Sequence, residues 1–292
     1  MGEVGLPAPD RHRFEVHEQA LSVLGVGTMT ALLAKGGPLN PVFLEVMTVS
    51  IIYGAVLVAC RGRAGRFDQR ISWVLSYVFV VWFYLAVARI TPALGTALRD
   101  GPLLAADEAL FGRTPAVFLE RTATAWLTDL MSLCYMTYHL YLPVAVVHAA
   151  AVSNMAARRL MIYLFTGFAI GFAGYLLVPA IGPARAFPEL FHASLAGGTL
   201  WRCIDQVVTK GSSGYDCFPS LHVLIACILL DHDWRHVRWR FWIMVFPSMG
   251  LLISTIYLRY HYGVDVLAGL LFFLVIRAIF LKTGRMEARV AG

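Results

Sequence analysis

Two short stretches of the chain combine side chains that can carry out acid–base and phosphate chemistry. The first reads Phe-Pro-Ser220-Leu-His222, and the second contains Arg259, His261 and Asp265 in close succession. Both stretches adjoin long apolar runs, where an ionisable side chain is costly unless it serves a function. We therefore treat them as two halves of one candidate site.

His261 and Asp265 have the spacing of a nucleophile and its orienting partner. They are four residues apart at the start of an apolar helical run, so their side chains share one helix face. A carboxylate in that position accepts a hydrogen bond from the imidazole, which fixes the tautomer and leaves the other ring nitrogen free to attack.

The first stretch has the pattern of a helix start that binds an anion. Proline before Ser220 is expected at a first-turn position, where free backbone N–H groups and the helix dipole favour negative charge. Ser220 adds a hydroxyl donor, and His222 is suited to protonate a leaving oxygen. Arg259 and Arg185 are candidates to neutralise phosphate oxygens. Together these residues predict phosphoryl transfer.

Each of these residues alone has an ordinary structural explanation. A single histidine at a helix end is more often structural, and a single interfacial arginine often extends its charge toward water. A non-catalytic transporter or scaffold therefore stays open as another class of function. Transport would favour broken helices at the middle of the membrane, whereas these ionisable residues cluster at one face.

The composition predicts an all-α membrane protein. Hydrophobic residues make up 59% of the 292 residues and charged residues 14%, which is typical of a polytopic helical bundle. Six apolar runs are long enough to cross a bilayer, and two shorter ones bring the expectation to seven or eight spans. The long runs are 41–60, 71–92, 131–151, 159–181, 241–259 and 262–281, and the shorter ones are 20–34 and 218–230. We expect a single membrane domain, with N-terminal helices in residues 1–69 and a catalytic core in residues 70–292.

The basic residues predict the orientation. The net charge is +6, but Lys and Arg cluster in short segments between apolar runs, which excludes a nucleic-acid-binding surface. These clusters fall at 11–13, 61–70, 158–159, 235–240 and 282–289. The positive-inside rule then places both termini in the cytoplasm. It also places His222 and His261 on the same non-cytoplasmic face of a plasma or inner membrane.

Two long outer loops are expected, at 93–130 and 182–217. The first ends in an amphipathic segment, 118–130, which is typical of a helix lying on the membrane surface. Four polar aromatic residues follow at helical spacing: Tyr135, Tyr138, His139 and Tyr141. They fit an interfacial aromatic belt or, in a functional interpretation, a polar wall for a lipid head group.

The five cysteines divide into two groups. Cys60, Cys134 and Cys227 fall in or beside apolar runs and suit small core positions. Cys203 and Cys217 both lie in the second outer loop, where an oxidising compartment favours a disulfide between them.

Neither a metal nor a cofactor is predicted. His232 and His236, with Asp231 and Asp233, are expected on the cytoplasmic side beside three arginines. That composition is more typical of a solvated loop than of a ligand set.

The two motifs resemble a known superfamily. The stretch ending at His222, together with Ser254-Thr-Ile-Tyr-Leu-Arg-Tyr-His261-Tyr-Gly-Val-Asp265, is similar to the second and third signatures of the type 2 phosphatidic acid phosphatase superfamily. The residues of these two motifs most resemble those of the inositol phosphorylceramide synthase branch. The resemblance covers roughly residues 70–281 and implies a six-helix core, with the helices before residue 70 as an addition.

The resemblance also implies a mechanism. His261 would form a phosphohistidine, Asp265 would orient it, His222 would act as the general acid and Ser220 would bind phosphate. Two features depart from the family pattern. Thr255 stands where an arginine is expected, and the first signature is absent, leaving the segment Gly-Pro-Ala-Arg185 as the nearest equivalent.

Fewer cations favour a substrate with less negative charge. A phosphate monoester is close to a dianion, whereas a phosphodiester lipid carries one charge at its phosphate. The sequence thus favours an inositolphosphotransferase-like enzyme with a phospholipid donor and a lipid alcohol acceptor.

The alternative is a lipid phosphate phosphatase that hydrolyses phosphatidate or a prenyl diphosphate with water. A vanadate-dependent haloperoxidase fits less well because such sites use more basic residues. The oligomeric state is not predicted.

Overall fold

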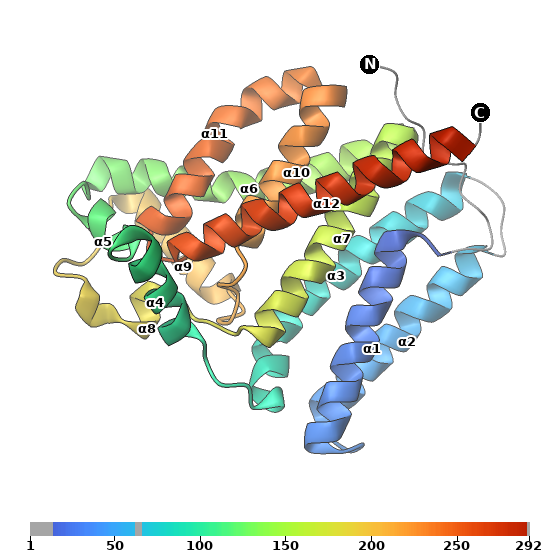
Figure 1. Ribbon diagram of the computed structural model, residues 1–292, viewed down its shortest axis with the longest axis horizontal. Coiled ribbons are helices and arrows are strands. Elements are labelled where there is room, and N and C mark those ends of the chain that lie inside the picture. Colours follow the sequence, from blue (N-terminus) through green and yellow to red (C-terminus); the bar gives the residue numbers. More distant parts are fainter. Residues whose placement is uncertain (1–13, 62–65, 291–292) are drawn as a thin grey trace.

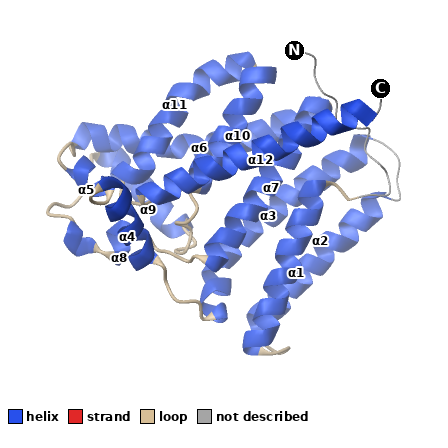
Figure 2. Cartoon of the chain, viewed as in Figure 1, coloured by secondary structure: helices blue, strands red, loops and turns tan. Residues whose placement is uncertain are grey.

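The computed structural model describes residues 14–61 and 66–290. Within these ranges every regular element is a helix and there is no strand (Figures 1 and 2). The prediction of an all-α polytopic bundle is confirmed.

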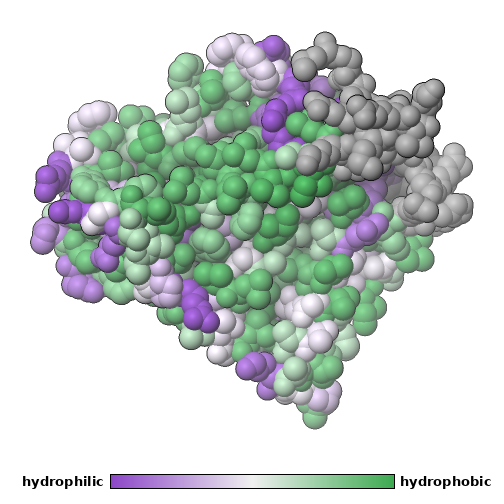
Figure 3. Space-filling model, viewed as in Figure 1, coloured by the Kyte–Doolittle hydropathy of each residue, from purple (hydrophilic) through white to green (hydrophobic). Residues whose placement is uncertain are grey.

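Six helices are long and apolar enough to cross a membrane, and they coincide with the six long apolar runs. They are α2 Pro41–Arg61, α3 Arg66–Leu94, α6 Ala125–Val152, α7 Met155–Leu177, α11 Arg238–Tyr257 and α12 Gly263–Val290. Apolar side chains cover much of the visible face of the bundle (Figure 3). Such a surface requires a hydrocarbon environment, so the chain is an integral membrane protein.

The two shorter apolar runs are also helical, as α1 Val16–Gly36 and α10 Leu221–His236. Helix α1 packs against α2, α3 and α7, and α10 packs against α7, α11 and α12. Val223, Leu224 and Ile225 of α10 have no exposed surface. Neither helix meets the length and hydropathy of the six spans, so crossing by these two stays a prediction, as does a boundary at residue 70.

The end of α10 is ordered and partly buried, so the prediction of a solvated loop at 231–236 is wrong. Asp233 has no exposed surface and accepts two hydrogen bonds of 2.6 Å from the guanidinium of Arg240. The hydroxyl of Tyr141 donates to the same carboxylate at 2.7 Å. These bonds to both carboxylate oxygens offset the cost of burying the ion pair.

The loop at 93–130, which the sequence predicts to lie outside, contains two short helices, α4 Asp100–Phe111 and α5 Pro115–Glu120. The predicted surface helix over 118–130 is therefore wrong. The Thr122 hydroxyl donates to the Leu119 carbonyl at 2.7 Å, and the chain turns before α6 begins at Ala125. The apolar residues keep a helical spacing across 118–130, so the pattern looks continuous. The turn between Glu120 and Ala125 nevertheless divides this segment between α5 and α6.

The loop at 182–217 contains α8 Pro183–Ala186, the 3-10 helix η1 Pro188–Leu190 and α9 Thr199–Gly211. Just before α8, Gly182 has φ +87°, and a Cβ there would lie 2.4 Å from the Tyr260 carbonyl oxygen. Only glycine permits both this conformation and this approach. In Figure 1 the helices α4, α5, α8 and α9 gather at one end of the bundle.

Candidate functional site

The structure brings the two predicted motifs together at this end of the bundle. The Ser220 N–H donates to the Asp265 carbonyl at 3.1 Å, which joins the start of α10 to the start of α12. The imidazole rings of His222 and His261 meet edge to face, with 5.6 Å between their centroids. Residues far apart in sequence thus form one buried cluster.

The carboxylate of Asp265 is held by several donors on one oxygen. His261 Nδ1 lies 3.5 Å from Asp265 Oδ2. The predicted proximity is present, but the predicted shared helix face is wrong, because His261 lies in the turn before α12, which begins at Gly263. Asp265 Oδ2 also accepts from the Tyr262 N–H at 2.9 Å and from the Cys217 thiol at 2.8 Å. Because Asp265 is fully buried, these contacts fix the face that it presents to His261.

The ring of His222 lies against the outer part of α6. Its centroid is 4.7 Å from the ring centroids of both Tyr135 and Tyr138, and 6.2 Å from that of His139. Its buried Nδ1 has no hydrogen-bond partner among the described residues. Three of the four polar aromatics on α6 therefore wall the candidate site, whereas Tyr141 pairs with Asp233 at the other end of α10.

Ser220 is the N-cap residue of α10, with φ −66° and ψ 100°. The preceding proline thus lies before the N-cap, two residues ahead of the first helical residue, and the prediction of a first-turn proline is wrong. Ser220 has no exposed surface, and its hydroxyl has no partner in the part of the chain that the structure describes. A buried hydroxyl without a partner is uncommon, and it suits a donor to an absent phosphate oxygen.

The two predicted arginines lie further out. The guanidinium of Arg259 is nearly buried, donates to the Ala193 carbonyl at 2.8 Å and lies 3.4 Å from a Glu120 oxygen. Arg185 is exposed on α8. Among the described residues, no hydrogen bond joins either side chain to His222 or His261. Arg259 and Arg185 are therefore candidates for binding substrate outside the histidine pair.

Two aspartates of α4 hold the turn at 258–262, which carries His261, and neither was predicted from the sequence. Asp107 has no exposed surface and accepts from the N–H groups of Gly263 and Val264 at 2.9 and 2.8 Å, which caps α12. Asp100 accepts from the N–H of Gly182 and the hydroxyl of Tyr262, both at 3.0 Å. Their seven-residue spacing, which places both on one helix face, was the available signal.

The predicted disulfide is not formed. Cys203 is an exposed free thiol on α9, whereas Cys217 is a buried free thiol that contacts Asp265. Burial, together with the nearby Asp265 carboxylate, raises the pKa of the Cys217 thiol well above its usual range. The spacing of the cysteines gave no information on this, because α9 leaves Cys203 exposed, whereas the following loop carries Cys217 to the turn at 258–262, where its thiol donates to the Tyr260 carbonyl.

This difference predicts selective labelling. A maleimide reagent should modify Cys203 rapidly in the folded protein and Cys217 only after denaturation, because the thiolate is the reactive form. Peptide mass spectrometry of the wild type and of Cys203→Ser measures both rates. Recovery of a linked Cys203–Cys217 peptide under non-reducing conditions would contradict the structure.

Comparison with known proteins gives one match. The family model described as PAP2 superfamily matches residues 101–279. No curated protein and no solved structure matches the chain. The matched segment covers more than half of the chain and contains all the predicted site residues, including His222, His261 and Asp265. The chain therefore belongs to the PAP2 superfamily and is a membrane enzyme of the lipid phosphatase or phosphotransferase type.

Proposed function

We propose that this protein transfers a phosphoryl-containing head group from a phospholipid to a lipid alcohol, in the manner of an inositolphosphotransferase. The observation that carries the proposal is the pair of imidazoles, 5.6 Å apart between centroids, of which only His261 lies beside a buried carboxylate. One histidine is arranged as a nucleophile and the other as an acid–base group. The expected location is the non-cytoplasmic face of a plasma or inner membrane.

In the first half-reaction, Nε2 of His261 attacks the phosphorus of the donor phosphodiester. The new P–N bond forms as the bond to the diacylglycerol oxygen breaks, and His222 gives that oxygen its proton. Asp265 stabilises the positive charge that develops on the His261 ring. The Ser220 hydroxyl and the first N–H groups of α10 donate to the phosphoryl oxygens.

In the second half-reaction, the acceptor hydroxyl gives its proton to His222 and attacks the phosphohistidine. The P–N bond breaks, the head-group phosphate passes to the acceptor and both histidines return to their starting states. Replacing the acceptor with water would release the head-group phosphate instead, so exclusion of water decides between transfer and hydrolysis.

The charge around the site supports a diester donor. Thr255 occupies the position where the family pattern has an arginine, and its hydroxyl donates to the Leu252 carbonyl at 2.8 Å. Glu120, 3.4 Å from the Arg259 guanidinium, offsets part of the charge of that arginine, and Arg185 is exposed. With few free cations, a phosphate that carries a single charge is easier to bind than a dianion.

A product assay tests this function. Purified protein in vesicles should transfer labelled inositol phosphate from phosphatidylinositol to ceramide or to a diacylglycerol of different chain length. Diacylglycerol release should depend on the added alcohol, and His261→Ala should abolish it. Release of inorganic phosphate from phosphatidate at a higher rate, with no alcohol-dependent product, would favour the phosphatase alternative. Full activity of the His261→Ala variant would favour a non-catalytic site.

A further inference from the structure

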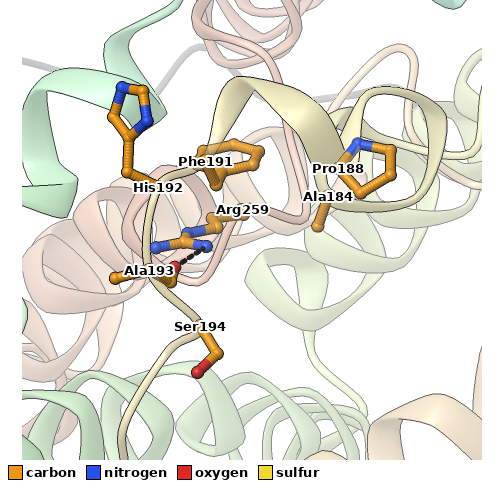
Figure 4. A pocket seen from close by; sticks show the side chains of 7 residues that line it. All are labelled: Ala184, Pro188, Phe191, His192, Ala193, Ser194 and Arg259. Atoms are coloured by element: carbon orange, nitrogen blue, oxygen red, sulfur yellow. Dashed lines mark hydrogen bonds between the residues drawn. The ribbon is translucent and has the colours of Figure 1, made fainter.

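A cavity of about 230 Å³ lies beside the turn at 258–262, between Arg259 and the segment 188–194 that follows α8 (Figure 4). The rings of His222 and His261 do not line it. It is nevertheless linked to them, because the Ala184 N–H at its edge donates to the Arg259 carbonyl at 3.2 Å. The cavity thus adjoins the reacting centre through the backbone that carries His261.

Arg259, in the wall of this cavity, has a backbone conformation that is unusual for a residue other than glycine. Its φ is +64°, in the left-handed region, which costs a residue other than glycine about 1–2 kcal/mol. Glycine would take this conformation without strain. The chain therefore has an arginine at a position that glycine would occupy more easily, which indicates that the side chain itself is needed. This side chain lies in the cavity wall, with only 7% of its surface exposed.

The guanidinium of Arg259 keeps unused donors. Of its five N–H groups, one donates to Ala193 and another faces Glu120, while the buried Nε has no partner among the described residues. Glu120 is itself shared, since the Ala193 N–H donates to the same oxygen at 2.7 Å. A buried cation with spare donors favours a ligand that brings acceptor oxygens.

The remaining wall defines the shape of that ligand. The Phe191 ring covers the guanidinium, with 4.1 Å between the Arg259 Cζ and the ring centroid, and Figure 4 shows Arg259 between Phe191 and Ala193. Because the guanidinium already occupies one face of the Phe191 ring, that face is not open to a quaternary ammonium group, whereas the spare N–H donors of Arg259 can bind the hydroxyl oxygens of a head group. The volume is smaller than that of a typical drug-sized pocket, so it suits a small polar group.

We propose that this cavity is the subsite for the donor head group, and that it selects hydroxyl-bearing head groups without positive charge over choline and ethanolamine. This inference rests on the proposed function, because a head group reaches the cavity only if its phosphate sits at the histidine pair. Arg259 then binds the part of the donor beyond the reacting phosphate.

Donor kinetics test the selection. Phosphatidylinositol, phosphatidylglycerol, phosphatidylcholine and phosphatidylethanolamine of identical acyl chains are compared with the wild type, Arg259→Gln and Arg259→Gly. Both variants should raise KM for the two hydroxyl-bearing donors about tenfold or more, the size expected for a lost charged hydrogen bond, with a smaller change in kcat. Arg259→Gly keeps the backbone unstrained and so separates side-chain loss from distortion. Arg202→Gln, which removes an equal charge from an exposed position on α9, should stay within twofold.

A binding measurement separates failure of this proposal from failure of the proposed function. Inositol 1-phosphate, glycerol 1-phosphate and phosphocholine are titrated against the full-length protein by calorimetry, without any turnover. The first two should bind at least tenfold more tightly than phosphocholine, and Arg259→Gln should remove the difference. Equal affinity for all three compounds would overturn the subsite even if transfer is observed. Selective binding without transfer would retain the subsite and reject the transfer reaction.

Discussion

His261→Ala is expected to lower kcat at least a thousandfold, because the proposed reaction cannot form its covalent intermediate without that imidazole. His222→Ala should cost roughly 10²–10⁴-fold, the usual contribution of a general acid. The nucleophile variant should therefore be the more damaged of the two. Steady-state rates with a labelled phospholipid donor measure both effects.

The intermediate itself provides the sharper readout. With donor labelled at the head-group phosphate and no acceptor, the wild-type protein should retain label through a bond that is stable in alkali and labile in acid. The label should be absent from His261→Ala. His148→Ala, on the opposite half of α6, serves as the matched control and should label normally. Labelling of the His261→Ala protein would assign the nucleophile to another residue.

Asp265→Asn is expected to reduce kcat by about 10²–10⁴-fold with little change in KM, since the side chain does not touch the donor. The carboxylate lies 3.5 Å from Nδ1 of His261, where an acceptor favours the tautomer that carries its proton on Nδ1. An amide can present its NH₂ group instead, which favours the wrong tautomer and stabilises the developing positive charge less well. The kcat and KM values of the variant give the test.

Asp231→Asn is the control for this substitution. Asp231 lies at the far end of α10, where it pairs with Arg235 and Arg277, so its loss should leave kcat within about twofold. An Asp265→Asn protein with an intact kcat would remove Asp265 from the mechanism. A variant that fails to fold is recognised by its elution profile and thermal unfolding, and Asp265→Glu then provides the second comparison.

The parts of the fold that depend on residues close together in the sequence could be predicted. Runs of apolar residues long enough for a bilayer identify six spans, because no other environment accommodates such helices. The four-residue spacing of His261 and Asp265 predicted their proximity, although a turn before α12 and not a shared helix face brings them together. Their approach to His222 followed from the distribution of basic residues, which placed both motifs at the same end of the bundle.

The outer loops could not be predicted in the same way. Their helices are short, and their positions depend on single side-chain contacts such as those of Asp100, Asp107 and Thr122. A sequence pattern does not distinguish a buried acidic cap from a solvated one. The same limitation explains Cys217, whose partner is a carboxylate in another helix and not the second cysteine of its own loop.

Helix α4 has a further consequence for control of the enzyme. One of its faces carries Asp100 and Asp107, which hold the turn bearing His261, while Glu108 and Leu110 are exposed on the other side. A protein that binds the exposed side and rotates α4 would break the hydrogen bonds by which both carboxylates hold this turn. Such a molecule would act as a non-competitive inhibitor, because it would stop turnover without entering the space that the lipid occupies.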